Sequence, residues 1–277
     1  MTPISIYRRK PEIIKALHRL LIRLHPDSPH FERMKDILYQ QEAGYIGEVK
    51  VDNILHSIHF PEPVKILTNV ELAISPGNFI PIDTLIVSST SILILEIKNI
   101  AGTFTYIPNP PHFVRTYQGK ESIVIDCPFM QLRRNQIGLD QWLAKNRLPI
   151  KSTGMIVMAN HKTSVLNAPP DMPIHYAKHL SVLLRGTEPK KQIMTQSQIN
   201  ELAYKLQQDL RPYNPYPICE KYNIDPRHLK KGFICSNCST NLIRYSERKW
   251  ECPTCGELTD QSYLGNGAGI LGILMPR

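Results

Sequence analysis

Two acids and a lysine interrupt two apolar segments of this chain, at a spacing suited to metal chemistry. Asp83 lies in the segment 80–88, and Glu96 and Lys98 lie in the segment 91–98. Strand alternation places Glu96 and Lys98 on one face of their strand. Both faces are otherwise apolar, so we expect a central strand, in which a charge is costly unless it is paired or binds a metal.

Only "SST" connects the two segments, which predicts antiparallel neighbours whose acids, Asp83 and Glu96, can point into one pocket. Converging carboxylates repel each other, and a divalent cation removes the repulsion; oxygen ligands select Mg²⁺ or Mn²⁺. Lys98 beside such an ion could orient water or stabilise charge on a phosphate, as in phosphodiester hydrolysis. The alternative is a buried Glu96–Lys98 or Asp83–Lys98 ion pair that only holds the hairpin together.

Two further side chains could reach the same place. Glu48 lies in a helix predicted at 31–58, ahead of the strands, and Gln131 lies in the first turn of a helix predicted from Phe129 to Lys145. In isolation, an acid at such a position is more commonly a solvent-facing helix residue, and such a glutamine is more commonly a surface or cap residue.

These motifs together resemble the nuclease-related domain family, NERD, which is placed in the PD-(D/E)xK nuclease-like superfamily. They are "GE" in a helix, "IDTLIVSSTSILILEIKNIAGTF", and "PFMQ" before a helix, over roughly residues 40–160. The sequence departs from the family at Thr84, where a histidine is common, and at Cys127-Pro128, where Asn-Pro is common. Gly102 matches the glycine that often follows the ExKN strand.

The resemblance implies a restriction-endonuclease-like fold and a metal-dependent nuclease. It implies that Asp83 and Glu96 bind Mg²⁺ or Mn²⁺, with DNA expected as the partner rather than RNA. The positions that correspond to the family's active site are Glu48, Asp83, Glu96, Lys98 and Gln131. A nuclease fold can also serve as a binding scaffold without activity.

The order of the other elements predicts an α/β fold with a mixed central sheet flanked by helices. Further strands are expected at 64–74, 103–107, 121–126 and in "GMIVMAN", and a helix in "QSQINELAYKLQQDL". The segment 8–23 is predicted to be an amphipathic helix with a basic face, which either faces solvent or contacts nucleic acid.

Four of the six cysteines form two CxxC pairs, separated by thirteen residues. This spacing predicts a structural zinc ribbon in which the thiolates fill the coordination sphere, so that metal binding supplies much of the module's stability. The expected ligands are Cys235, Cys238, Cys252 and Cys255. Cys127 and Cys219 stand apart.

The chain is basic, with a formal net charge of +9, which favours a polyanionic partner, although basic proteins without one are common. Around the cysteines, basic and aromatic side chains suit phosphate contacts and base stacking, and a protein-binding or merely solvated surface is an equal alternative. The proposed nucleic-acid contacts are Lys230, Lys231, Arg244, Arg248, Lys249 and Trp250, with Tyr245 nearby.

Four prolines in "RPYNPYPICEKYNIDPRH" predict a linker. No secretory signal and no apolar run of the ~20 residues that span a bilayer are visible, so we expect a cytoplasmic protein without a membrane partner. The expected division is a basic helical segment (1–39), a nuclease-like domain (40–210), a linker (211–229), a zinc ribbon (230–262) and a glycine-rich tail (263–277).

Three hypotheses remain. The first is a metal-dependent nuclease whose ribbon aids substrate binding. The second is a nucleic-acid-binding or adaptor protein on an inactive nuclease-like scaffold. The third is an ion-paired structural core with a protein-binding ribbon, which predicts no metal in the first domain and no salt-dependent DNA binding.

Overall fold

The computed structural model describes residues 7–119, 122–148, 150–185, 191–210, 213–235 and 237–260. The chain divides into two compact units. The first unit combines Met1–Arg9 with Ala43–Pro212, and the second combines Lys10–Glu42 with Tyr213–Arg277. The long helix α2 (Phe31–His56) contributes to both. The predicted glycine-rich tail lies outside the described residues.

A five-stranded mixed sheet forms the centre of the first unit, in the order β1-β2-β3-β7-β9. β1, β2 and β3 are antiparallel, whereas β7 and β9 run parallel to β3 and to each other. The mixed sheet and the antiparallel neighbours predicted from the sequence are confirmed. The strands are β1 (Val64–Ser75), β2 (Asn78–Ser88), β3 (Ile92–Lys98), β7 (Ser152–Met158) and β9 (Ile174–Tyr176).

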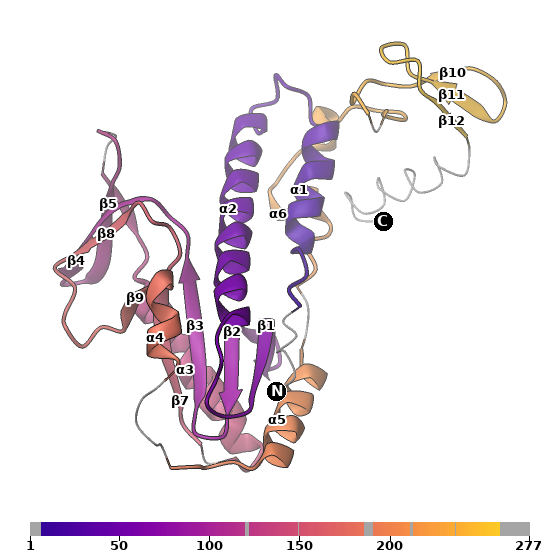
Figure 1. Cartoon of the computed structure of the whole chain (residues 1–277). Coiled ribbons are helices and arrows are strands. Elements are labelled where there is room, and N and C mark those ends of the chain that lie inside the picture. The colour runs from indigo at the N-terminus through magenta and orange to yellow at the C-terminus, as the bar shows by residue number, and fades with distance from the viewer. Residues whose placement is uncertain are drawn as a thin grey trace. The chain divides into compact units, whose positions relative to one another are not determined.

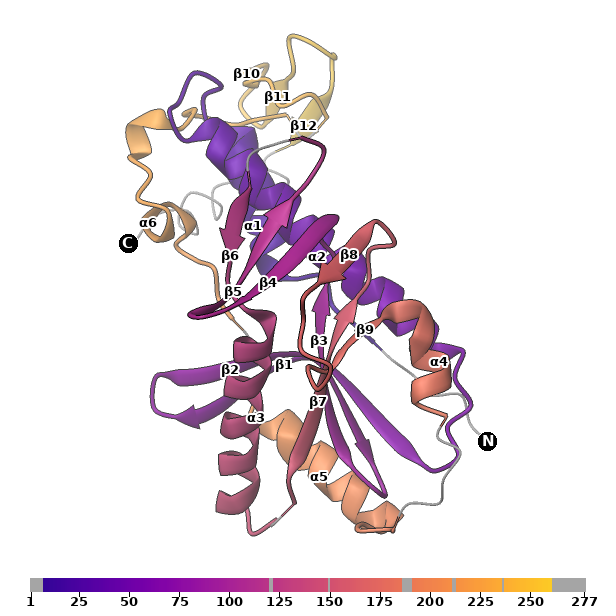
Figure 2. The ribbon, with the colours of Figure 1, turned by 90° about the vertical axis from the view of Figure 1, so that its left-hand side faces the viewer.

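Helices cover both faces of this sheet (Figures 1 and 2). On one face, α3 (Pro128–Lys145) and α5 (Gln196–Gln208) pack into a core that includes Ile92 and Ile94. On the other face, the C-terminal half of α2 and the short α4 (Leu180–Leu183) enclose a second core with Leu95 and Ile97. β3 is therefore apolar on both sides, as predicted, which makes any charged residue in it exceptional.

A second sheet, in the order β6-β5-β4-β8, follows β3 (Figure 2). Its connection to β3 requires Gly102, which has a φ of +121°, and a Cβ there would lie 2.6 Å from the Thr116 carbonyl oxygen. Only glycine tolerates both conditions. The strands of this sheet are β4 (Gly102–Pro108), β5 (Pro111–Thr116), β6 (Ile123–Ile125) and β8 (Thr163–Leu166). The 3₁₀ helix η1 (Ala177–His179) follows β9.

In the second unit, the helix predicted in the segment 8–23 is confirmed as α1 (Glu12–Arg23), with its apolar stripe buried. The segment expected to be a linker contains α6 (Ile218–Lys221), in which Cys219 is buried, and the 3₁₀ helix η2 (Pro226–His228). A three-stranded antiparallel sheet follows, made of β10 (Ile243–Arg244), β11 (Lys249–Glu251) and β12 (Leu258–Asp260).

Among the helices that the structure describes, none is both long and apolar enough to cross a membrane.

Candidate active site

The candidate site begins where β2 and β3 stop pairing. The register between the two strands ends at Thr84 and Leu95. Just beyond, the backbone N–H of Ile97 donates to Asp83 Oδ2 at 2.7 Å, so a side chain takes the place of a strand carbonyl. The carboxylate of Asp83 is thereby held in the gap between the two strands, with Oδ1 left for another partner.

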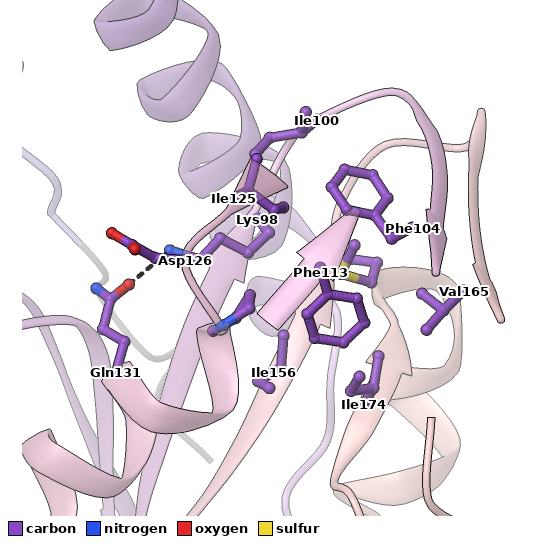
Figure 3. A pocket seen from close by; sticks show the side chains of 12 residues that line it. Lys98, Ile100, Phe104, Phe113, Ile125, Asp126, Gln131, Ile156, Val165 and Ile174 are labelled. Carbon is purple, nitrogen blue, oxygen red and sulfur yellow. Dashed lines mark hydrogen bonds between the residues drawn. The ribbon is translucent and has the colours of Figure 1, made fainter. Parts of the chain in front are cut away.

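From the same end of β3, Glu96 and Lys98 project towards α3. Lys98 Nζ lies 2.8 Å from Glu96 Oε1 and donates to Gln131 Oε1 at 2.9 Å (Figure 3). Gln131 stands in the first turn of α3, and one turn further on, Asn135 Nδ2 lies 3.4 Å from Glu96 Oε2. The lysine is thus positioned by an acid on its own strand and an amide from the helix.

Helix α2 reaches this site because of Gly47. A Cβ at Gly47 would lie 2.3 Å from the Cβ of Asn99, the residue that follows β3, so a larger residue would force the helix away. Asn99 also ties the helix down by donating from Nδ2 to the Ala43 carbonyl at 2.8 Å. The next residue, Glu48, is consequently held near the end of β3.

Arg8, which the sequence did not single out, is buried beside these acids and uses all five of its N–H groups. Its Nε and one Nη2 hydrogen donate to Asp52 at 2.7 and 3.0 Å. Nη1 donates to Glu48 at 2.8 Å and to Asn69, and the second Nη2 hydrogen goes to Thr84 at 2.7 Å. Arg8 therefore connects α2 to β1 and β2.

Part of this arrangement was open to sequence reasoning. Glu48 and Asp52 stand four residues apart on one helix, so their side chains share a face, and a pair of acids there calls for a cation. Arg8 carried no such signal. It precedes α1 in a basic segment whose other charges are mostly exposed, and only its fold position buries it.

Burial and mutual repulsion make the acids harder to ionise. Burial, followed by the charge of Asp83, raises the pKa of Glu48 and of Glu96 to about 7, against the lowering effects of Arg8 and Lys98 respectively. Burial also raises the pKa of Asp83, although the Ile97 N–H and the charge of Lys98 oppose it. For Arg8, burial alone would lower the pKa, but the Asp52 hydrogen bond and the charge of Glu48 raise it.

When all the acids ionise, Glu48, Asp52, Asp83 and Glu96 carry four negative charges, against the two positive charges of Arg8 and Lys98 that lie beside them among the described residues. The Lys98 contact with Glu96 Oε1 is an ion pair without good hydrogen-bond geometry, and this buried oxygen has no hydrogen bond. Oxygen donors with a surplus of negative charge fit Mg²⁺ or Mn²⁺. Within the described parts of the chain, the four cysteines are the one group of three or more His, Cys, Asp or Glu side chains whose ligand atoms converge closely enough to hold a metal ion.

Two cavities open beside these residues. An apolar pocket of about 220 Å³ has Lys98, Gln131 and Asp126 in its wall, and a polar cleft of about 540 Å³ runs along α3 past Arg134 and Asn135. Asp126 and Gln131 line both, so the cavities adjoin at the candidate site.

The four cysteines of the second unit converge as their spacing predicts. The Sγ atoms of Cys235, Cys238, Cys252 and Cys255 all lie within 4.8 Å of one another, an arrangement compatible with a zinc ribbon. Hydrogen bonds with Thr240 and then Cys252 lower the pKa of the Cys238 thiol to about 6, which favours the thiolate that a metal requires.

The basic residues predicted to contact nucleic acid differ in availability. Lys230 donates from Nζ to the Ile22 carbonyl at 3.2 Å, so its ammonium group is already hydrogen-bonded near the end of α1. Trp250 is half-buried, with its ring edge-on to Phe233 at 5.3 Å between centroids. The exposed members of the set are Lys231, Arg244, Arg248 and Lys249.

Residues 43–159 match the family model of the nuclease-related domain. This part of the chain is similar to the nuclease-related domain, NERD. The match spans a little under half of the chain and includes α2 from Ala43, β1 to β7 and α3, but not Arg8 or α5. The resemblance inferred from the motifs is thereby confirmed. No curated protein and no solved structure matches the chain.

All five residues that the sequence assigned to the NERD site come together in the structure. They arrive from four elements: Glu48 from α2, Asp83 from β2, Glu96 and Lys98 from β3, and Gln131 from α3. The NERD match supports a nuclease-related function and, with it, nucleic acid as a partner.

Proposed function

We propose that this protein is a divalent-metal-dependent nuclease that hydrolyses phosphodiester bonds, with DNA as the substrate to test first. The observation that carries the proposal is the excess of carboxylates over cations around Asp83 and Glu96, directly beside the Lys98–Gln131 pair and at the junction of two cavities. Buried acids without a counter-ion are costly, and an ion-paired core would have no need of them.

Asp83 and Glu96 would hold the ion through Asp83 Oδ1 and Glu96 Oε1, because their other oxygens accept from Ile97 and Asn135. When bound, Mg²⁺ or Mn²⁺ would supply Lewis-acid stabilisation of charge on the phosphate. The Lys98 ammonium would orient the attacking water or donate to a phosphate oxygen. Gln131, whose oxygen is taken by Lys98, would donate an amide N–H to the substrate.

Glu48 and Arg8 have supporting roles in this proposal. Glu48 adds a carboxylate on the side opposite α3, and Arg8 fixes its orientation through the 2.8 Å contact from Nη1. Arg8 is thus a positioning residue, contributed by a segment outside the NERD match.

The cysteine module would bind structural zinc and aid substrate binding through Arg244, Arg248 and Lys249, whose side chains are exposed to solvent. Replacing these three residues with alanine should lower affinity for any sequence and reduce the dependence of binding on salt, by about one unit of slope for each phosphate that is no longer neutralised. An unchanged salt dependence would show that these residues of the ribbon do not contact the nucleic acid.

The deciding experiment measures cleavage of labelled single-stranded DNA, duplex DNA and RNA in Mg²⁺, Mn²⁺ or EDTA. Asp83→Asn and Lys98→Met should each reduce the metal-dependent rate about a hundredfold or more, since each removes a group that acts on the reacting phosphate or its ion. The matched controls make the same changes at exposed positions, as Asp171→Asn and Lys65→Met. These two variants should cleave at the wild-type rate.

Failure of the wild type to cut any substrate with any metal, while it still binds nucleic acid, would establish the alternative of a non-catalytic binding protein on a nuclease-like scaffold. Cleavage that survives Asp83→Asn would place the activity elsewhere in the preparation.

A further inference from the structure

The pocket beside Lys98 is lined mostly by apolar side chains. It lies between the two sheets of the first unit, where Figure 3 shows Phe104 and Phe113 from the second sheet facing Ile156 and Ile174 from the central sheet. Both phenylalanines are almost fully buried, at 3% and 2% exposure. With a volume of about 220 Å³, the pocket is smaller than the ~300–1,000 Å³ typical of drug-sized ligands.

Polar groups occur at only one end of this pocket. They are Lys98 and Gln131, which touch each other, and the exposed carboxylate of Asp126. A ligand that enters must therefore be apolar over most of its surface, with polar groups only at the end where Lys98, Gln131 and Asp126 lie. A carboxylate at the rim also suits a ligand with N–H donors.

The adjoining cleft suits the rest of a nucleic-acid strand. It is larger and more polar than the pocket, follows one side of α3, and carries the exposed Arg134 with Asn135 along its length. Because Asp126 and Gln131 belong to both cavities, a chain of phosphates in the cleft would pass within reach of the pocket.

We propose that the pocket binds the base of one unpaired nucleotide next to the phosphate that Lys98 contacts, so that the substrate is single-stranded or has an unpaired residue at the cleavage position. This rests on the proposed function for the location of the phosphate. A base in a duplex is stacked and paired, and reaches such a pocket only by leaving the stack. The wall away from Lys98, Gln131 and Asp126 carries no hydrogen-bonding side chain, so selection is for an unpaired base and not for a particular sequence.

The test is an abasic scan. Short single-stranded DNA oligonucleotides carry a tetrahydrofuran residue at one position after another, and binding to the wild-type protein is followed by fluorescence anisotropy with Ca²⁺ in place of Mg²⁺. One position should show a loss of affinity of about tenfold or more, with small effects at its neighbours, because the base buried in the apolar pocket is lost only there. The same scan on RNA shows whether the sugar matters.

A variant that fills the pocket provides the second arm. Val165→Phe adds bulk to the pocket wall, and Val124→Phe makes the same change at a 71%-exposed position in the same sheet, away from the pocket. Val165→Phe should weaken binding of the intact strand about tenfold, and should cost nothing more when the oligonucleotide already lacks the critical base, since the two losses are then the same interaction. Val124→Phe should bind like the wild type.

A flat abasic scan on the wild-type protein overturns the proposal without any variant, and so does an equal response to Val165→Phe and Val124→Phe. The outcomes also separate the pocket from the nuclease. If the protein cleaves the strand equally well with and without the base, the nuclease proposal holds and the pocket does not bind a base. If binding requires a base at one position but no metal supports cleavage, the pocket binds a base and the protein is not a nuclease.

Discussion

The carboxylate site and the cysteine cluster are both candidate metal sites, and they are built in opposite ways. The four thiols come from two CxxC turns within 21 residues of sequence, and their sulfur atoms converge within 4.8 Å. The carboxylates come from α2, β2 and β3, and they are tied to Arg8, Lys98 and a backbone N–H. One site is formed by a short stretch of sequence, and the other is assembled by the fold from three separate elements.

This difference predicts what each metal does. A closed set of four thiolates fills a tetrahedral coordination sphere and leaves no place for a substrate, so the ion contributes to folding. Two or three carboxylates leave coordination positions free, and the fold around them exists without the ion because two hydrophobic cores support it. Removing metal should therefore unfold one region and leave the other intact.

The largest expected effect is on the cysteine module. Cys235→Ser with Cys252→Ser, or removal of zinc by a chelator, should unfold the ribbon, since structural zinc supplies about 10 kcal/mol or more in such modules. The two tryptophans separate the responses, because Trp250 lies in the ribbon and Trp142 in α3. When zinc or its cysteine ligands are removed, the fluorescence of Trp250 should change in a Trp142→Phe background. The fluorescence of Trp142 in a Trp250→Phe background should not change. Loss of both signals together would mean that the two regions depend on one metal.

The next effect concerns Arg8, whose replacement should lower the stability of the first unit. Arg8→Gln leaves Glu48 and Asp52 buried without their cation, and the free energy of unfolding should fall by about 3–5 kcal/mol in urea titrations followed by Trp142. Arg8→Lys keeps the charge but cannot make the two-pronged hydrogen bonds to Asp52, so its loss of stability should be smaller. The matched control Arg9→Gln changes an exposed neighbour. Equal stability of the Arg8 and Arg9 variants would show that the buried network contributes nothing.

The smallest effect is a pH dependence of the carboxylate site, opposite in sign to that of the zinc-binding thiols, which hold metal more tightly as the pH rises. The pKa of Glu48 and of Glu96 is about 7 in the folded protein and 4.5 in an exposed chain, so the folded state retains protons that the unfolded state has released. The free energy of unfolding measured in EDTA should therefore fall as the pH rises from 4.5 through 7, and then level off.

Glu96→Gln should flatten this profile, because it removes one of the two titrating groups, whereas Glu201→Gln, at an exposed position in α5, should not. Adding Mg²⁺ should stabilise the wild type more at pH 8 than at pH 5. A metal-free profile that rises between pH 4.5 and 7 would show that the acids are already compensated within the fold.

The amino-acid sequence by itself determined the parts of this protein that depend on local pattern. Alternation and a short connection were enough to predict β2 and β3 as antiparallel neighbours and β3 as a strand buried on both faces. The CxxC spacing was enough to predict the cysteine cluster, since each turn brings its own two ligands together. The motif order was enough to predict the similarity to the NERD domain.

Only the tertiary structure decided which distant residues complete the site. Arg8 reaches Glu48 across 40 positions and Thr84 across 76, and nothing in its neighbourhood distinguishes it from the exposed Arg9. The pocket beside Lys98 likewise arises where two sheets meet, with walls from strands of both sheets and from the start of α3. Such contacts depend on how whole elements pack, and packing is set by the sum of many weak contacts that no local pattern records.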